Sequence, residues 1–93
     1  MIFLILIQFY GYLKERFGEK IIVEKKNFEE ETIFSIVTNN MIEKDKQYFL
    51  DIIRNNPYLI IFKNEKSIEI NTIYNEKIQN GDIIKIYLSV SGG

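Results

Sequence analysis

The segment that most constrains the fold is an apolar run over residues 2–10, with the sequence IFLILIQFY. β-Branched and aromatic residues without polar alternation are typical of a central strand that is covered on both faces. The run is far too short to span a bilayer, and it has neither a basic leading segment nor a small-residue cleavage site. We therefore expect a buried strand in a cytoplasmic protein.

The composition excludes several kinds of chemistry. The 93 residues include no cysteine and no histidine, which excludes disulfides, thiolate or imidazole metal ligands, and Ser-His-Asp or Cys-His catalysis. The net charge is −1, whereas nucleic-acid binding needs a clustered basic surface. A chain of this length forms one domain with a modest core. We expect a single domain over residues 1–93, with no metal site and neither a nucleic-acid nor a membrane partner.

Apolar residues recur at helical spacing in the middle of the chain. The main helix is predicted from Thr32, a suitable N-cap, to about Ile42. A second, short helical segment is expected from about Asp45, and it stops at residues 55–57, where two asparagines precede a proline. A helical turn is also expected over residues 12–17.

β-Branched and aromatic runs predict further strands along the chain. Asn80-Gly81 is a strong turn signal directly before the last of these runs, and Asp82 is expected to be a turn residue. Strands that flank one long helix predict an α+β domain, with the helix packed on one face of a mixed sheet. In that sheet the first and last strands would pair in parallel at the centre. The expected strands are residues 2–10, 19–24, 58–62, 67–70 and 82–88.

The C-terminal sequence Ser91-Gly92-Gly93 presents a carboxylate on unhindered backbone. Glycine has no Cβ, so such an end can thread a narrow channel in another protein and adopt unusual backbone angles there. A frayed chain end is the alternative. Because the usual nucleophiles and bases are missing, the Gly93 carboxylate is the candidate reactive group.

Three segments together contain all five glycines of the chain: residues 9–18 (FYGYLKERFG), 80–84 (NGDII) and 90–93 (VSGG). The first resembles the strand-to-turn segment near the start of MoaD-like proteins, the small molybdopterin synthase subunits of the MoaD/ThiS-like sulfur carriers. The second resembles the Gly-Asp turn that opens their last strand, and the third resembles their C-terminus. The resemblance covers essentially the whole chain.

This resemblance implies a β-grasp, ubiquitin-like fold: a mixed sheet, one main helix on one face, a second short helix, and a flexible C-terminal tail over residues 89–93. It also implies a sulfur carrier. A MoeB/ThiF-like adenylyltransferase, which resembles ubiquitin-activating enzymes, would use ATP and Mg²⁺ to adenylate Gly93, and sulfur would then replace AMP to give a thiocarboxylate. The MoaE-like large subunit of molybdopterin synthase would receive that sulfur for molybdenum cofactor biosynthesis. The chain itself would bind no cofactor and form the non-catalytic subunit.

The expected site residues surround this tail. A side chain in place of Gly92 would clash in a narrow channel, and Ser91 and Val90 are expected to line the same channel. Val90 is alternatively the last core residue of the strand. Tyr87 and Lys85 share the strand face opposite the core. If that face is exposed, Tyr87 is a docking anchor for a partner, and otherwise it is a partly packed surface residue.

The pathway is left open by the sequence. Leu88-Ser89 stands where MoaD-like proteins often carry Pro-Pro, which leaves the receiving partner undetermined. ThiS-like carriers for thiamine or tRNA thiolation share the Gly-Gly ending but usually lack a segment like residues 45–56. Ubiquitin-like modifiers that are conjugated to lysines share the ending as well.

Overall fold

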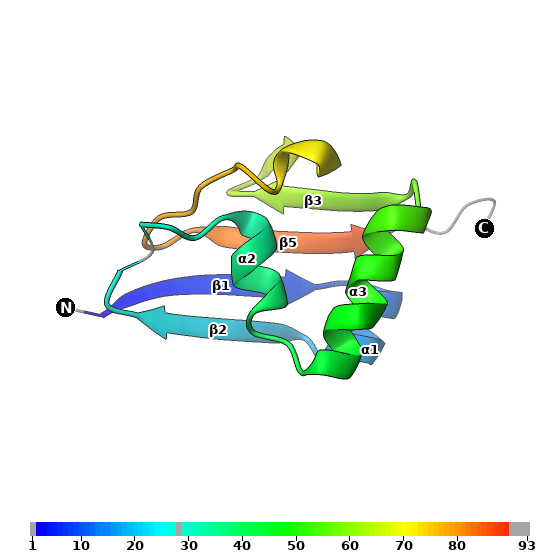
Figure 1. Ribbon diagram of the computed structural model, residues 1–93, viewed down its shortest axis with the longest axis horizontal. Helices are drawn as coiled ribbons and strands as arrows, with labels where there is room; N and C mark the ends of the chain where they lie inside the picture. Colours follow the sequence, from blue (N-terminus) through cyan, green and yellow to red (C-terminus); the bar gives the residue numbers. More distant parts are fainter. Residues whose placement is uncertain (1, 28, 90–93) are drawn as a thin grey trace.

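The computed structural model describes residues 2–27 and 29–89, which form a five-stranded mixed sheet with helices α2 and α3 across one face (Figure 1). This arrangement confirms the predicted α+β class. The strands are β1 (Phe3–Phe9), β2 (Lys20–Lys25), β3 (Leu59–Lys63), β4 (Lys66–Ile68) and β5 (Ile83–Leu88). The helices are α1 (Tyr12–Phe17), α2 (Ile33–Thr38) and α3 (Glu43–Asn55), with a 3-10 turn, η1 (Ile70–Thr72).

The first and last strands lie together in the middle of the sheet. Across the sheet the order is β2-β1-β5-β3-β4. β1 and β5 pair in parallel, while β1 with β2, β3 with β5, and β3 with β4 pair antiparallel. The parallel central pairing predicted for the first and last apolar runs is therefore confirmed.

The core lies between the sheet and the helices. β1 contributes Ile5, Ile7 and Phe9, and β5 contributes Ile84 and Ile86, all of them 0% or 1% exposed. The expectation that β1 is covered on both faces is wrong. Its alternate residues face away from the helices, so that Leu4 is 46% exposed. An apolar run does not by itself show whether both faces of a strand are covered, because that depends on where the helices pack.

Helix α2 begins as predicted and ends early. Thr32 is its N-cap, with a side-chain oxygen that accepts a backbone hydrogen bond from the first turn. The helix ends at Thr38 and does not continue to Ile42. The reason is local: the Asn40 side-chain amide donates to the Ile36 carbonyl at 2.7 Å, which satisfies a carbonyl that a longer helix would use.

Helix α3 is longer than α2, although the sequence predicts a short second helix. It begins at Glu43, and the acids of its first turn, Glu43 and Asp45, favour a helix N-terminus there. It ends where predicted: Asn56 is the C-cap, and its side-chain oxygen accepts from the Tyr58 N–H at 2.8 Å around Pro57. The division of the helical region into one long and one short helix is thus reversed.

The remaining boundaries differ from the prediction by a few residues. β2 begins and ends one position later, and β4 ends at Ile68 because η1 begins at Ile70. Ile73 and Ile78 in the irregular segment that follows are 0% and 4% exposed. Their burial holds this segment against the core.

Glu31 links the end of β2 to the start of α2. Its carboxylate pairs with the Lys25 ammonium and accepts a hydrogen bond from the Ser35 hydroxyl at 2.8 Å. Burial acts to raise the pKa of Glu31, but the hydrogen bonds from Lys25 and Ser35 and the charge of Lys25 outweigh it. The pKa therefore lies below its ordinary value of 4.5.

We expect Glu31→Gln to lower the free energy of unfolding by about 1 kcal/mol at neutral pH. A lowered folded-state pKa contributes stability that is fully present above the unfolded-state value and is lost as the pH falls through the folded-state value. Urea melts of the two proteins should therefore differ at pH 7 and converge as the pH falls below 4.5, the unfolded-state value. A difference that persists in acid would contradict this account of Glu31.

Candidate functional site

The strand that leads into the expected tail is the central strand of the sheet. β5 ends at Leu88, and Ser89 continues its pairing, because the Ser89 N–H donates to the Tyr58 carbonyl at 3.0 Å. The structure therefore fixes the point where the tail begins, beside the loop between α3 and β3. The other tail residues predicted for the site, Val90, Ser91, Gly92 and Gly93, lie outside the described residues.

Tyr87 and Lys85 lie on the sheet face that the helices leave uncovered, which we call the open face. Ile84 and Ile86, which alternate with them along β5, are buried in the core. Strand pairing and alternation assign residues of all five strands to the open face. They are Leu4, Leu6, Gln8 and Tyr10 at β1, Lys20, Ile22 and Glu24 on β2, Ile60 and Phe62 on β3, Ser67 on β4, and Ile83, Lys85 and Tyr87 on β5.

Tyr87 belongs to an aromatic cluster at the end of the open face where β5 finishes. Its ring is stacked on Tyr10, with centroids 4.4 Å apart and planes 8° apart. Phe62 meets it edge-on from the other side, at 5.7 Å and 80°. The Tyr10 hydroxyl donates to the Gln8 side-chain oxygen at 3.1 Å. Two neighbours thus fix the Tyr87 ring, which lowers the entropy that it loses when a partner binds.

Tyr10 and Phe62 are functional candidates that the sequence reasoning missed. Both lie in runs that read as strand, and nothing local indicates that both rings contact Tyr87 of β5. Strand register could have found them, because Phe62 lies next to Lys85 in the β3–β5 pairing. That register depends on contacts far apart in the sequence.

Lys85 occupies the middle of the open face. Its ammonium pairs with the carboxylate of Glu65 from the β3–β4 turn. The hydrogen bond that the Lys85 ammonium donates to Glu65 raises the pKa of Lys85, against a smaller opposing effect of burial. Glu65 and its neighbour Asn64 both have positive φ angles, 69° and 52°. The charge of Lys85 is therefore neutralised by a residue of the same chain.

The other end of the open face is aliphatic and hollowed. A shallow cavity of about 330 Å³ lies there, and its lining is mainly apolar. Leu4 and Leu6 come from β1, and the side chain of Ile22 is 56% exposed. The remaining lining residues are Ile5, Lys20, Gly81, Asp82 and Ile83. The open face therefore joins an aromatic end near the tail to an aliphatic hollow at the start of β5.

The turn before β5 is held by Asp82. One carboxylate oxygen accepts from the Gln79 N–H at 2.7 Å, and the other accepts from the Asn64 side-chain amide at 2.8 Å. Asn64 in turn accepts from the Ile83 N–H at 2.9 Å. Gly81 has a φ of 88°, which glycine adopts without strain. Asp82 thus acts as a turn residue, as expected, and ties the turn to the β3–β4 hairpin.

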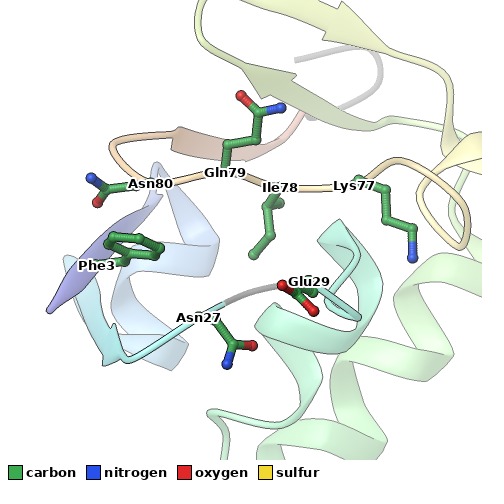
Figure 2. Close-up of a pocket in the computed structure, with 7 residues that line it drawn as sticks. All are labelled: Phe3, Asn27, Glu29, Lys77, Ile78, Gln79 and Asn80. Carbon is green, nitrogen blue, oxygen red and sulfur yellow. The ribbon is translucent and has the colours of Figure 1, made fainter. Parts of the chain in front are cut away.

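A second cavity, of about 350 Å³, lies at the end of the sheet where β1 begins. Figure 2 shows Phe3 on one side, Asn27 and Glu29 on the adjoining loop, and the segment from Lys77 to Asn80 across from them. The side chains that line it are of mixed chemistry and do not converge on one point. It lies at the other end of the sheet from the end of β5, so it is separate from the point at Ser89 where the tail begins.

The described side chains offer little for catalysis on their own. Within residues 2–27 and 29–89, no group of three or more acidic, histidine or cysteine side chains is placed to hold a metal ion. No helix in the described part of the chain is long and apolar enough to cross a membrane. What the site supplies is a rigid, largely apolar surface beside the start of the tail.

No protein-family model matches the chain, and no curated protein matches it in sequence. Among solved structures, it is similar to the solution structure of Urm1 from Trypanosoma brucei, with a TM-score of 0.73 and 15% identity over 99% of this chain and 97% of that chain. It is similar to a chain in the complex of subunits 1 and 2 of molybdopterin-converting factor from Helicobacter pylori 26695, with a TM-score of 0.55 and 20% identity over 100% of both chains.

A third similar structure is the solution structure of the Haloferax volcanii HVO 2177 protein, with a TM-score of 0.62 and 14% identity over 99% of this chain and 88% of that chain. In all three cases the similarity extends over nearly the full length of both chains. At identities this low, the similarity establishes the fold. The chain therefore has the ubiquitin-like β-grasp fold of the MoaD/ThiS-like proteins that its sequence resembles.

Proposed function

We propose that this chain is a sulfur carrier whose Gly93 carboxylate is adenylated and then converted to a thiocarboxylate. The observation that carries the proposal is the position of β5. This central strand of a ubiquitin-like sheet ends beside the aromatic cluster of the open face and leads into the sequence VSGG. A partner that docks on the open face is then close to the start of the tail.

The chemistry needs no side-chain nucleophile from this chain. A terminal carboxyl has a pKa of roughly 3.5, so at neutral pH it is an anion. One carboxylate oxygen attacks the α-phosphorus of ATP, and pyrophosphate leaves. Sulfide, or an equivalent sulfur nucleophile that the partner holds, then attacks the acyl carbon, and the C–O bond to AMP breaks as the C–S bond forms. Activation as an acyl-adenylate divides one difficult substitution into two easier ones.

The proposed partners supply the groups that this chain lacks for these steps. A MoeB/ThiF-like adenylyltransferase binds ATP and Mg²⁺, and the chain presents its tail to it in the cytoplasm. The Helicobacter pylori structure to which the chain is similar is a complex of two subunits of molybdopterin-converting factor, which supports a MoaE-like large subunit as the acceptor. Molybdenum cofactor biosynthesis is thus the favoured pathway.

Two alternatives use the same tail. A ThiS-like carrier would deliver sulfur for thiamine synthesis or tRNA thiolation. A ubiquitin-like modifier would form an isopeptide bond between Gly93 and a lysine of another protein. Leu88-Ser89 stands where prolines are frequent in MoaD-like proteins. It therefore does not favour any one of the three functions.

The test is intact mass spectrometry of the chain after incubation with ATP, Mg²⁺, sulfide and a MoeB/ThiF-like adenylyltransferase. A mass increase equal to one oxygen exchanged for one sulfur supports the carrier. An unchanged mass, with the chain attached to lysines of other proteins in a cell lysate, would overturn the carrier in favour of the modifier. Acceptor assays with a MoaE-like subunit then separate the molybdopterin pathway from thiolation of thiamine or tRNA.

Tyr87 is the expected anchor of the adenylating partner on the open face. Tyr87→Ala removes a ring that Tyr10 and Phe62 hold in place, and it should weaken docking by about 30-fold, or about 2 kcal/mol. Because docking precedes chemistry, the loss should appear in KM for the chain in ATP–pyrophosphate exchange, with little change in kcat.

Tyr74→Ala is the matched control. Tyr74 is also an exposed tyrosine next to another ring, with its centroid 4.8 Å from that of Phe34, but it lies on the helix-covered side. It should leave KM unchanged. Equal effects of the two substitutions on KM would contradict docking through the open face.

A further inference from the structure

Lys85 is the charged residue at the centre of the open face, whose other charged strand residues, Lys20 and Glu24, lie on the edge strand β2. In the strand pairing it stands between Gln8 of β1 and Phe62 of β3. Ile83 and Tyr87 flank it along β5, and its own side chain is 22% exposed. Any partner that covers the open face must therefore cover the Lys85 ammonium as well.

The residue that neutralises Lys85 stands in an unfavourable backbone conformation. Glu65 has a φ of 69°, in the left-handed region that glycine adopts readily and glutamate does not. Asn64 beside it, at 52°, has a local reason for its conformation, because asparagine tolerates this region and its amide holds the turn before β5. The side chain of Glu65 is 77% exposed, and its described partner is Lys85. Asn64 and Glu65 are the two central residues of the turn that joins Lys63 to Lys66, and a two-residue hairpin turn of this kind requires positive φ at both.

Desolvation explains why such a pair would be kept. An ammonium that loses its water without gaining a counter-ion is strongly disfavoured, whereas a paired ammonium is much less so. With Glu65 in place, the centre of the open face carries no net charge. A partner therefore needs no charged group opposite this pair. A carboxylate on the partner would compete with Glu65 for Lys85.

We propose that Glu65 is a positioning residue that holds and neutralises Lys85, so that the open face accepts an apolar surface of the adenylating partner with no carboxylate opposite Lys85. This inference rests on the proposed function, and it specifies the chemistry of the partner at that site. Glu65 itself lies at the edge of the contact, since most of its side chain is exposed.

The test is a double-mutant cycle on ATP–pyrophosphate exchange by the MoeB/ThiF-like enzyme. Glu65→Gln leaves an uncompensated ammonium under the partner and should raise KM for the chain by about tenfold, with kcat unchanged. Lys85→Met removes the charge and should lower KM, because a buried ion pair is often replaced by apolar side chains without loss. In the Lys85→Met background, Glu65→Gln should have no further effect.

The opposite pattern would overturn the proposal. If Lys85→Met raises KM and Glu65→Gln lowers it, the partner supplies its own carboxylate to Lys85. Equal KM values for all four proteins would show that the pair takes no part in docking. Concentration-dependent self-association of the unaltered chain, abolished by Glu65→Gln, would mean that the apolar surface belongs to a second copy.

Two further measurements separate the role of Glu65 in docking from an effect on stability and from the proposed function. Glu65→Gly relieves the positive-φ strain while it removes the carboxylate, so it should be no less stable than the unaltered chain in urea and yet dock as poorly as Glu65→Gln. Retention on a phenyl matrix tests the face without any enzyme: Glu65→Gln should elute earlier than the unaltered chain, and Lys85→Met later. If the unaltered chain is never adenylated, only the proposed function is overturned. The order in which the three proteins elute from the phenyl matrix would still decide the role of Glu65.

Discussion

Deletion of Gly93 is expected to abolish thiocarboxylate formation, with a loss of at least about 100-fold in the rate of adenylation. The deletion leaves a carboxylate on Gly92, but it shortens the tail by up to about 3.6 Å. The distance from the start of the tail at Ser89 to the α-phosphate is set by the partner, so the shortened end cannot reach in-line geometry. Docking through the open face should be retained, and the deletion should therefore lower kcat.

Ser89→Ala provides the control for this deletion, since the backbone N–H of Ser89, and not its side chain, bonds to Tyr58. It keeps the length of the tail and changes one small side chain, so most of the activity should remain. Intact mass spectrometry after incubation with the adenylyltransferase, ATP and sulfide reads out both variants. Full conversion of the shortened chain would show that the activating enzyme accepts a carboxylate on Gly92, and the expected dependence on tail length would then be wrong.

The largest effect on stability is expected from Phe49→Ala, which should lower the free energy of unfolding by about 4 kcal/mol. Phe49 is 1% exposed, and its ring meets Phe17 of α1 with centroids 6.1 Å apart at 82°. Truncation leaves a cavity where α3 packs on the core and also removes the contact with α1. A domain of this size has about 5–15 kcal/mol of stability, so the loss is a large fraction of it.

Thermal melts measure this loss, and the expected fall in Tm is about 15 °C or more. Gln47→Ala on the same helix is the matched control. Gln47 is exposed, with a hydrogen bond to Glu43 at 2.9 Å, and its substitution should change stability by less than about 0.5 kcal/mol. Similar melting temperatures for Phe49→Ala and the unaltered chain would mean that α3 is not part of the cooperative core.

The features that sequence predicted correctly depend on local signals. Thr32 caps α2 through a hydrogen bond within its own first turn. The Asn80-Gly81 turn needs a positive φ at Gly81, which the residue type itself indicates. Alternation along β5 placed Tyr87 and Lys85 on the face opposite the core. Each of these outcomes is decided by residues within a few positions of one another.

The features that the sequence did not predict depend on distant residues. Whether the second face of β1 is covered depends on where α2 and α3 pack, so Leu4 and Leu6 could not be assigned to solvent from their run alone. Lys85 and Glu65 are 20 positions apart, and no spacing rule connects them. The early end of α2 depends on Asn40, which could equally have been an exposed position of a longer helix.

The central position of β5 has a mechanical consequence. The strand is hydrogen-bonded along both sides, to β1 and to β3. A force applied to the tail along the strand loads these bonds together, in shear, whereas a strand at the edge of the sheet can peel away one bond at a time. An enzyme that draws the end of this chain into a channel can therefore exert tension without extracting the strand. Under such tension it is the rate of unfolding, and not the equilibrium stability, that limits how long the domain survives.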